Sequence, residues 1–220
     1  MQEPTGDKDD VKARILNVAM EQFAKNGYAG TSIRQICDAA EVNVASVNYY
    51  FRSKELLYHD VFRTLFEDFG KPLERIPDKI HDAASWRAAL LEYIASILRM
   101  ITNDNPPFVW VSRLIALERT SPSSVCPLLF DSFFKRGHDS LEKMLRMGLP
   151  ADVDSATLMI WTTSVMSQFM VFLHRSPPWN ELIIPQTISR DEWIDRTVQH
   201  ILEGITTRLS YHPDKSGKAL

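Results

Sequence analysis

The residues from Val44 to Lys54 combine small side chains with two tyrosines and a lysine, a set suited to binding duplex nucleic acid. Val44, Ala45, Ser46 and Asn48 are small or uncharged. Side chains of this size let a helix come close to base edges, where asparagine pairs with adenine and an apolar side chain contacts the thymine methyl. Large charged side chains would hold the backbone away from the groove.

Tyr49, Tyr50 and Lys54 have polar ends suited to phosphate. Lys54 lies in the first turn of the next predicted helix, where the helix dipole disfavours a cation by a few tenths of a kcal/mol. A phosphate there would meet the lysine and free amide groups together. Taken singly, the aromatic residues are also explained by core packing and Lys54 by solvation. The joint arrangement favours a nucleic-acid contact.

Three short predicted helices position these residues. Apolar residues four apart predict a helix over 10–26, which Gly27 is placed to end. Thr31 or Ser32 caps a second helix, and Gln35 can reach back to Ser32 in a capping box. The turn "AEVN" follows, with Glu41 where a left-handed residue is often needed, and Asn43 caps the third helix. Two helices joined by so short a turn are typical of a helix-turn-helix.

Residues 31–57 resemble the DNA-binding signature of the TetR family of transcriptional regulators. The matching residues are Thr31, Ile36, Ala40, Val42, Asn43, Tyr49, Tyr50, Phe51, Lys54 and Leu57. Glu41, Cys37 and Tyr50 depart from it, standing where glycine, alanine and histidine are usual. The segment "NVASVNYYF" is similar to the YbiH/CecR-like branch. The DNA-binding residues that we predict are Thr31, Ser32, Arg34, Asn43, Val44, Ala45, Ser46, Asn48, Tyr49, Tyr50 and Lys54.

The rest of the chain is also predicted to be helical, so the fold class is all-α, with about nine helices. Ser53 caps a fourth helix, and longer helices are predicted over 85–101, 107–118, 125–147, 154–174 and 191–209. The predicted organisation is a flexible tail over 1–9, a helix-turn-helix domain over 10–53, a helical domain over 54–210 and a second tail over 211–220. The resemblance implies that the second domain binds a ligand and forms a dimer.

Apolar and aromatic residues of the second domain could line an effector pocket or only fill a core. Arg113 and Gln168 interrupt apolar stretches, and a buried polar group costs about 1–3 kcal/mol unless it is paired. Arg113 and Glu118 could pair within the fold, or Arg113 could face an anionic ligand. The predicted pocket residues are Phe62, Phe66, Tyr93, Met100, Phe108, Trp110, Arg113, Phe133, Met166, Gln168 and Phe169.

The last two predicted helices are candidates for a homodimer interface, because each has an apolar side. The predicted interface residues are Trp161, Thr162, Val165, Phe169, Ile194, Val198, Ile201 and Ile205. A two-fold axis would place two recognition helices about 34–36 Å apart on a palindromic operator. The resemblance implies release of the operator when a small apolar or aromatic effector shifts the fourth helix, and repression as the default.

Charge argues against a broad basic surface. The net charge is −3, and residues 1–60 hold seven Lys and Arg against nine Asp and Glu. A few placed charges must therefore bind DNA. Cys37 and Cys126 fall in apolar helical patterns and are interpreted as reduced thiols of a cytoplasmic protein. No apolar run of about 18 residues predicts a membrane span, and no secretory leader is apparent.

Two other function classes remain open from the sequence. His-Asp occurs at 59–60, 81–82 and 138–139, and all-α metal-dependent phosphohydrolases use His and Asp ligands of this kind. No further acidic residue has the expected setting, and no "HExxH", phosphate loop or CxxC pair is present. A helical interaction module without DNA binding is the second alternative. We predict no enzymatic activity, no cofactor and no metal.

Overall fold

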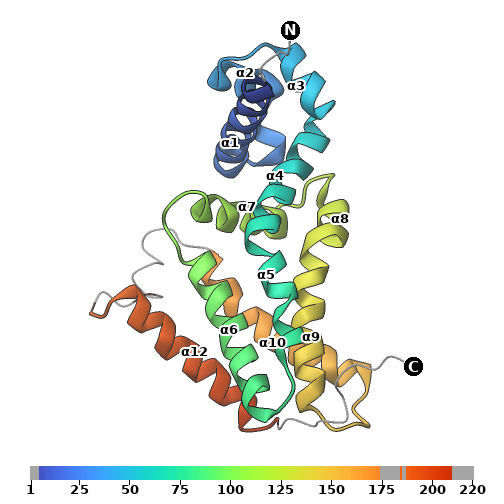
Figure 1. Cartoon of the computed structure of the whole chain (residues 1–220), viewed down its shortest axis with the longest axis vertical. Helices are drawn as coiled ribbons and strands as arrows, with labels where there is room; N and C mark the ends of the chain where they lie inside the picture. The colour runs from blue at the N-terminus through green and yellow to red at the C-terminus, as the bar shows by residue number, and fades with distance from the viewer. Residues whose placement is uncertain (1–4, 174–183, 185–186, 210–220) are drawn as a thin grey trace. The chain divides into compact units, whose positions relative to one another are not determined.

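The computed structural model describes residues 5–173, 184 and 187–209, with side chains from residue 10 onward except at 68 and 69. Every regular element in these ranges is helical, as predicted (Figure 1). The elements are α1 (Thr5–Gly30), α2 (Ile33–Ala40), α3 (Val44–Phe51), α4 (Lys54–Phe69), α5 (Lys71–Glu74), the 3-10 turn η1 (Ile76–Lys79), α6 (Ala83–Ile101), α7 (Phe108–Thr120), α8 (Cys126–Leu129), the π-turn η2 (Phe130–Phe134), α9 (Lys135–Gly148), α10 (Ser155–Met170), the 3-10 turn η3 (Val171–Leu173) and α12 (Arg190–Thr206).

The chain forms two compact units that do not follow its order. The first unit comprises Met1–Glu67 and Asn105–Phe133, and the second comprises Asp68–Asp104 and Phe134–Leu220. The predicted boundary at 53/54 does not coincide with this division, because most of α4 and all of α7 and α8 group with the first three helices. Of the predicted tails, 5–9 belong to α1, whereas 1–4 and 211–220 lie outside the described residues.

Helix α1 begins at Thr5, five residues before the predicted start, and breaks where the sequence indicates. Gly27 has φ 70° and ψ 173°. The positive φ favours glycine, although this ψ lies outside the left-handed helical region. The helical turn beyond Gly27 brings Tyr28 toward α4, where its ring centroid lies 5.0 Å from that of Tyr58.

An aromatic cluster forms the core of the first unit. Phe23 of α1 meets Tyr58 of α4 edge to face at 4.7 Å between ring centroids, and Tyr58 contacts Phe62 at 5.2 Å. All three side chains are almost completely buried. Edge-to-face rings add about 0.5–1.5 kcal/mol to the apolar burial. Helix α7 packs on α1 in the same unit. The cluster therefore joins the first, fourth and seventh helices.

Helix α6 lies at the centre of the second unit. It contacts α9 and α12, and Figure 1 shows α12 running alongside α6. Trp86 donates its indole N–H to the Met144 carbonyl at 2.9 Å, and Tyr93 donates its hydroxyl to the Gly137 carbonyl at 2.7 Å. Both side chains are buried, so these bonds satisfy donors that would otherwise cost about 1–3 kcal/mol each.

The helix predicted over 125–147 runs without interruption over 126–148, as α8, a π-turn over Phe130–Phe134 and α9. The π-turn within it was not predicted. The inserted residue of a π-turn rotates the apolar stripe. As a result Phe133 is buried while Phe130 is exposed.

One segment, Ser155–Leu173, is long and apolar enough to cross a membrane by length and composition, with a mean hydropathy of 1.4. This contrasts with the sequence expectation of no such run. A single helix of this kind is weak evidence for a membrane span, because helices of water-soluble proteins also meet these criteria. Only 33% of the segment is buried within the chain.

Candidate nucleic-acid interface

The turn between α2 and α3 has the geometry that the sequence predicts. Ser32 accepts a hydrogen bond from the Gln35 amide at 3.2 Å, and the Gln35 side chain accepts one from the Ser32 amide at 2.7 Å. Glu41 takes the left-handed conformation at φ 54° and ψ 46°. Asn43 Oδ1 accepts from the Ser46 amide at 2.8 Å and so caps α3. These bonds satisfy amides at both helix starts and fix the direction of α3.

Helix α3 turns one side to the core and one to solvent. Val47 and Phe51 are the buried pair, as predicted. Tyr49 is 74% exposed, and Val44, Ala45 and Asn48 are also exposed. Tyr50 is half-buried, with its ring 5.0 Å from Tyr49 and 6.3 Å from Phe51. The open side therefore carries the small side chains proposed for base contacts.

The other predicted DNA-binding residues have mixed surroundings. Ser32 and Arg34 are exposed on the α2 side. Ser46 is half-buried, and its hydroxyl bonds Asn43 Oδ1 at 3.0 Å, so both side chains support the helix start. Thr31 is 1% exposed, and its hydroxyl donates to the Gln22 and Gly27 carbonyls at 3.1 and 2.8 Å. The Thr31 hydroxyl therefore closes the turn before α2, and the DNA contact of this residue stays a prediction.

Lys54 lies above an aromatic ring rather than free in solvent. Its Nζ is 4.3 Å from the centroid of Tyr28, a cation–π contact. Burial lowers the pKa of Lys54, and neighbouring Glu55 opposes this shift. The Tyr28 hydroxyl donates to Glu55 at 2.8 Å. Burial, followed by this bond, raises the pKa of Tyr28 to about 12. The N-terminal turn of α4, which Ser53 caps, thus presents an ordered ammonium group.

The sequence did not single out Tyr28 and Arg52. Tyr28 follows the break at Gly27, so no helical period connects it with the residues that it contacts. Arg52 is exposed at the C-terminal cap of α3, with φ 66°. A basic residue between the paired tyrosines and Lys54 was the available signal for a second phosphate contact.

Comparison with known proteins identifies the family that has this helix-turn-helix. Residues 15–61 match the description "Bacterial regulatory proteins, tetR family", and residues 86–206 match "HTH-type transcriptional dual regulator CecR, C-terminal domain". The second match spans more than half of the chain. The chain belongs to the TetR family of transcriptional regulators. Its C-terminal domain is CecR-like, as its resemblance to that branch indicated. The family consists of DNA-binding regulators and not enzymes.

Individual relatives cover most of this TetR-family chain. RutR of Escherichia coli K12 is 29% identical over 210 residues, covering 90% of this chain and 91% of RutR. CecR of Shigella flexneri is 24% identical over 172 residues, covering 74% and 76%. YttP of Bacillus subtilis is 31% identical over 113 residues, about half of each chain.

The fold also matches a solved structure of AibR in complex with isovaleryl coenzyme A and operator DNA. The TM-score is 0.62 with 19% identity, covering 86% of this chain and 97% of AibR.

The predicted effector-pocket residues fall in both units. Phe62, Phe66 and Phe133 gather in the first unit, with Phe133 centroids 6.4 Å and 5.2 Å from the other two. Arg113 is exposed on α7, which does not support its placement in a buried pocket. Phe108 and Trp110 are half-buried on the same helix. In the second unit Met100 and Met166 are half-buried, Tyr93 and Phe169 are core residues, and Gln168 is exposed.

Seven of the eight predicted dimer residues are buried within their own chain, and their role in an interface stays a prediction. Thr162, Val165, Phe169, Ile194, Val198, Ile201 and Ile205 are each at most 4% exposed. Helix α12 packs on α6 and α10 packs on α9, and only Trp161 is partly open. The exposed apolar residues of this region are Met159, Ile160 and Val171.

A cavity of about 350 Å³ lies between α10 and α12. Its wall includes Trp161, Ser164, Gln168, His200 and Gly204. Among the predicted pocket residues, Gln168 alone lines it. Trp161 is the predicted dimer residue on its wall that remains partly exposed.

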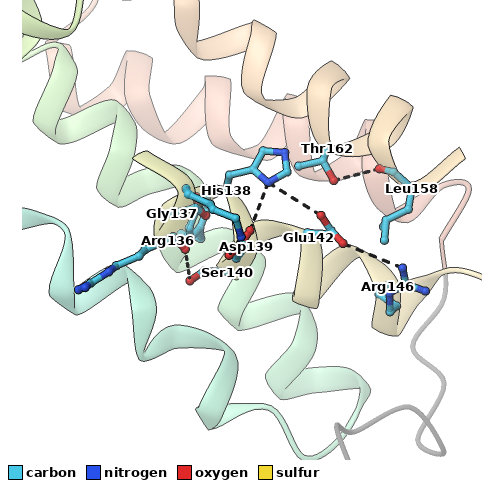
Figure 2. Close-up of polar contacts among 11 residues, drawn as sticks. Arg136, Gly137, His138, Asp139, Ser140, Glu142, Arg146, Leu158 and Thr162 are labelled. Atoms are coloured by element: carbon cyan, nitrogen blue, oxygen red, sulfur yellow. Dashed lines mark hydrogen bonds and ion pairs between the residues drawn. The ribbon is translucent and has the colours of Figure 1, made fainter. Parts of the chain in front are cut away.

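The residues of the three His-Asp pairs make contacts within the fold. His59 contacts the Phe133 ring at 5.1 Å, and Asp60 accepts from Arg63 at 3.0 Å. Asp82 caps α6. Figure 2 shows His138 on α9, with Nδ1 3.7 Å from Asp139 and 3.9 Å from Glu142.

The group on α9 does not make a metal site by itself. Its three potential ligand atoms lie within 4.8 Å of one another, but they come from consecutive turns of one partly exposed helix surface. Asp139 pairs with Lys135 at 2.7 Å. Glu142 lies 4.0 Å from Arg146, as Figure 2 shows. The neighbouring cations account for both carboxylates as ordinary helix-surface pairs.

Proposed function

We propose that this TetR-family regulator is a homodimeric repressor that binds a palindromic operator and releases it on binding an apolar effector. The observation that carries the proposal is the exposed side of α3, with Ala45 and Asn48 beside the ordered Lys54. As a bacterial transcription regulator it acts on DNA in the cytoplasm.

In the proposed complex, α3 enters the major groove. Val44 and Ala45 contact thymine methyl groups, and Asn48 pairs with adenine through two hydrogen bonds. Lys54, Tyr49 and the exposed Arg52 contact phosphates on either side of the groove. The net charge of −3 provides no general attraction to DNA, so in the proposed complex these few contacts must supply the binding.

The proposed dimer uses the exposed sides of α10 and α12. Met159 and Ile160 are 64% and 65% exposed, and large apolar side chains so open to water are suited to burial against a second copy. Gly204 and the small residues Thr163, Ser164 and Ser167 would let helices approach closely. This interface would use the helices chosen from sequence but the opposite side of each.

The proposed effector is a small apolar molecule, and an acyl thioester of coenzyme A is the first class to test. AibR, with a similar fold, is described in complex with isovaleryl coenzyme A. The aromatic residues Phe62, Phe66 and Phe133 of the first unit are candidate contacts for an acyl chain. An effector that favours the released state by about 1–3 kcal/mol would weaken operator binding 5- to 150-fold.

Selection of random duplex DNA on the purified protein at fixed salt near 150 mM, followed by sequencing, tests the proposal. We expect a palindrome whose half-sites lie about one helical turn apart. Asn48→Ala should then lose about 1–3 kcal/mol of discrimination at one base pair of each half-site. Lys54→Ala should weaken all sequences equally and make the salt slope shallower by about one unit. No enriched palindrome for wild type, or equal discrimination by wild type and Asn48→Ala at every base pair, would refute the assignment.

A further inference from the structure

Glu118 of α7 is a buried carboxylate held by neutral donors. The residue is 4% exposed. Its Oε1 accepts from the Tyr58 hydroxyl at 2.7 Å, and its Oε2 accepts from the Ser123 amide and hydroxyl, both at 3.1 Å. Burying a carboxylate is costly unless hydrogen bonds compensate, so each of these donors matters.

Tyr58 connects this carboxylate to the aromatic cluster of the first unit. Its side chain is completely buried in α4. Its ring centroid lies 4.7 Å from Phe23 and 5.0 Å from Tyr28. The hydrogen bond to Glu118 fixes the depth and tilt of the ring, because a phenol with a short bond at its tip has little freedom to slide between its neighbours.

Tyr28 connects Tyr58 to Lys54, the residue proposed to contact a phosphate. Its ring lies under the Lys54 ammonium group at 4.3 Å, and its hydroxyl donates to Glu55 at 2.8 Å. The rings of Tyr58 and Tyr28 therefore link Glu118 of α7 to the ring beneath Lys54.

We propose that Glu118 and Tyr58 are positioning residues for the phosphate contact of Lys54. They hold the Tyr28 ring, and the ring holds the ammonium group where a phosphate approaches the first turn of α4. A displacement of α7 would move the Tyr58 hydroxyl and, through the contact between the Tyr58 and Tyr28 rings, Lys54. This inference rests on the proposed phosphate contact of Lys54 and extends it to a helix that follows more than 50 residues later in the chain.

Tyr58→Phe tests the inference because it removes one hydroxyl and keeps the ring. Tyr93→Phe is the matched control: it removes a buried hydroxyl that donates to the Gly137 carbonyl in the second unit, and Tyr93 contacts no part of α4 by hydrogen bonding. Operator affinity is measured as a function of salt for wild type and for both variants. The Tyr58→Phe measurement is repeated in a Lys54→Ala background.

We expect Tyr58→Phe to weaken operator binding and to make the salt slope shallower by a fraction of the unit that Lys54→Ala removes. In the Lys54→Ala background the same substitution should have no further effect, because there is no ammonium group left to position. Tyr93→Phe should leave the slope unchanged. A Tyr58→Phe effect of equal size in both backgrounds, or no effect in either, overturns the inference.

The result for Lys54→Ala alone distinguishes the proposed phosphate contact of Lys54 from the proposed positioning role of Glu118 and Tyr58. A normal salt slope in Lys54→Ala refutes the proposed phosphate contact and the positioning role with it. A shallower slope in Lys54→Ala, combined with an unaffected Tyr58→Phe, refutes the positioning role and leaves the phosphate contact standing.

Discussion

Glu41, in the turn before the recognition helix, provides a direct test of the backbone geometry. Its φ of 54° and ψ of 46° place a residue with a Cβ in the left-handed region. The side chain is exposed, and no hydrogen bond or ion pair of the described residues involves its carboxylate. Replacing Glu41 therefore changes backbone energy without removing a side-chain contact. We predict that Glu41→Gly stabilises the protein and that Glu41→Ala does not.

The magnitude follows from two opposing terms. A residue with a Cβ pays about 1–2 kcal/mol in the left-handed conformation, which glycine avoids. Glycine loses about 0.5–1 kcal/mol more conformational entropy on folding. The difference leaves Glu41→Gly more stable than Glu41→Ala by about 0.5–1 kcal/mol. The turn amides should keep their bonds, since the Val42 amide donates to the Cys37 carbonyl at 3.0 Å without using the side chain.

Urea and thermal unfolding of wild type and the two variants measure this difference. For a chain of this length about 1 kcal/mol corresponds to roughly 2–4 °C in the unfolding midpoint. Glu41→Ala serves as the control because it also removes the carboxylate and keeps the Cβ. Equal stability of the alanine and glycine variants would show that the turn does not hold this residue in a left-handed conformation.

Three further predictions concern the second unit and its surfaces. Gly148→Ala should destabilise the protein by about 1–3 kcal/mol, because the new Cβ would lie 2.5 Å from Trp86, whose indole N–H donates to the Met144 carbonyl. Gly137→Ala in the same helix is the control, because its Cβ would lie 3.8 Å from the Tyr93 hydroxyl, an ordinary contact. Chemical denaturation should show Gly137→Ala to be more stable than wild type by about 0.5–1 kcal/mol. Ile160→Glu should yield monomers in light scattering, whereas Leu128→Glu, also exposed but on α8, should remain dimeric; a dimeric Ile160→Glu would rule out the proposed face. The Thr157 amide donates to Asp154 at 2.7 Å and lowers the pKa of that carboxyl, so the cap stabilises α10 above the ordinary aspartate pKa of 3.8 and is lost as pH falls below it. Asp154→Ala should therefore lower the thermal midpoint at pH 7 and not near pH 2, and an equal loss at both pH values would contradict the capping role.

Local rules were sufficient for the helix-turn-helix. The Ser32–Gln35 box, the Asn43 cap and the Ser53 cap were all confirmed, because a cap depends only on residues within three or four positions of one another. The inward pair Val47 and Phe51 was confirmed for the same reason, since helical spacing decides which side chains share a side.

Short-range sequence patterns did not predict which helices pack against one another. The apolar residues of α10 and α12 were predicted to contact a partner chain. In the structure most of them are buried within the second unit, where α12 packs on α6. An apolar stripe on a helix predicts that this side is buried, but it does not identify the helix or the partner chain that buries it. The π-turn over Phe130–Phe134 was missed similarly, because periodicity continued across it in sequence.

The sequence by itself determined that the chain is helical, where its second, third and fourth helices are capped, and which short segment resembles a known DNA-binding signature. Only the tertiary structure decided that α7 belongs with the helix-turn-helix and that Glu118 meets Tyr58 across 60 positions. It also decided that Lys54 lies over Tyr28. Caps and periods are properties of neighbouring residues, whereas these contacts depend on how separate helices pack, which no local spacing encodes.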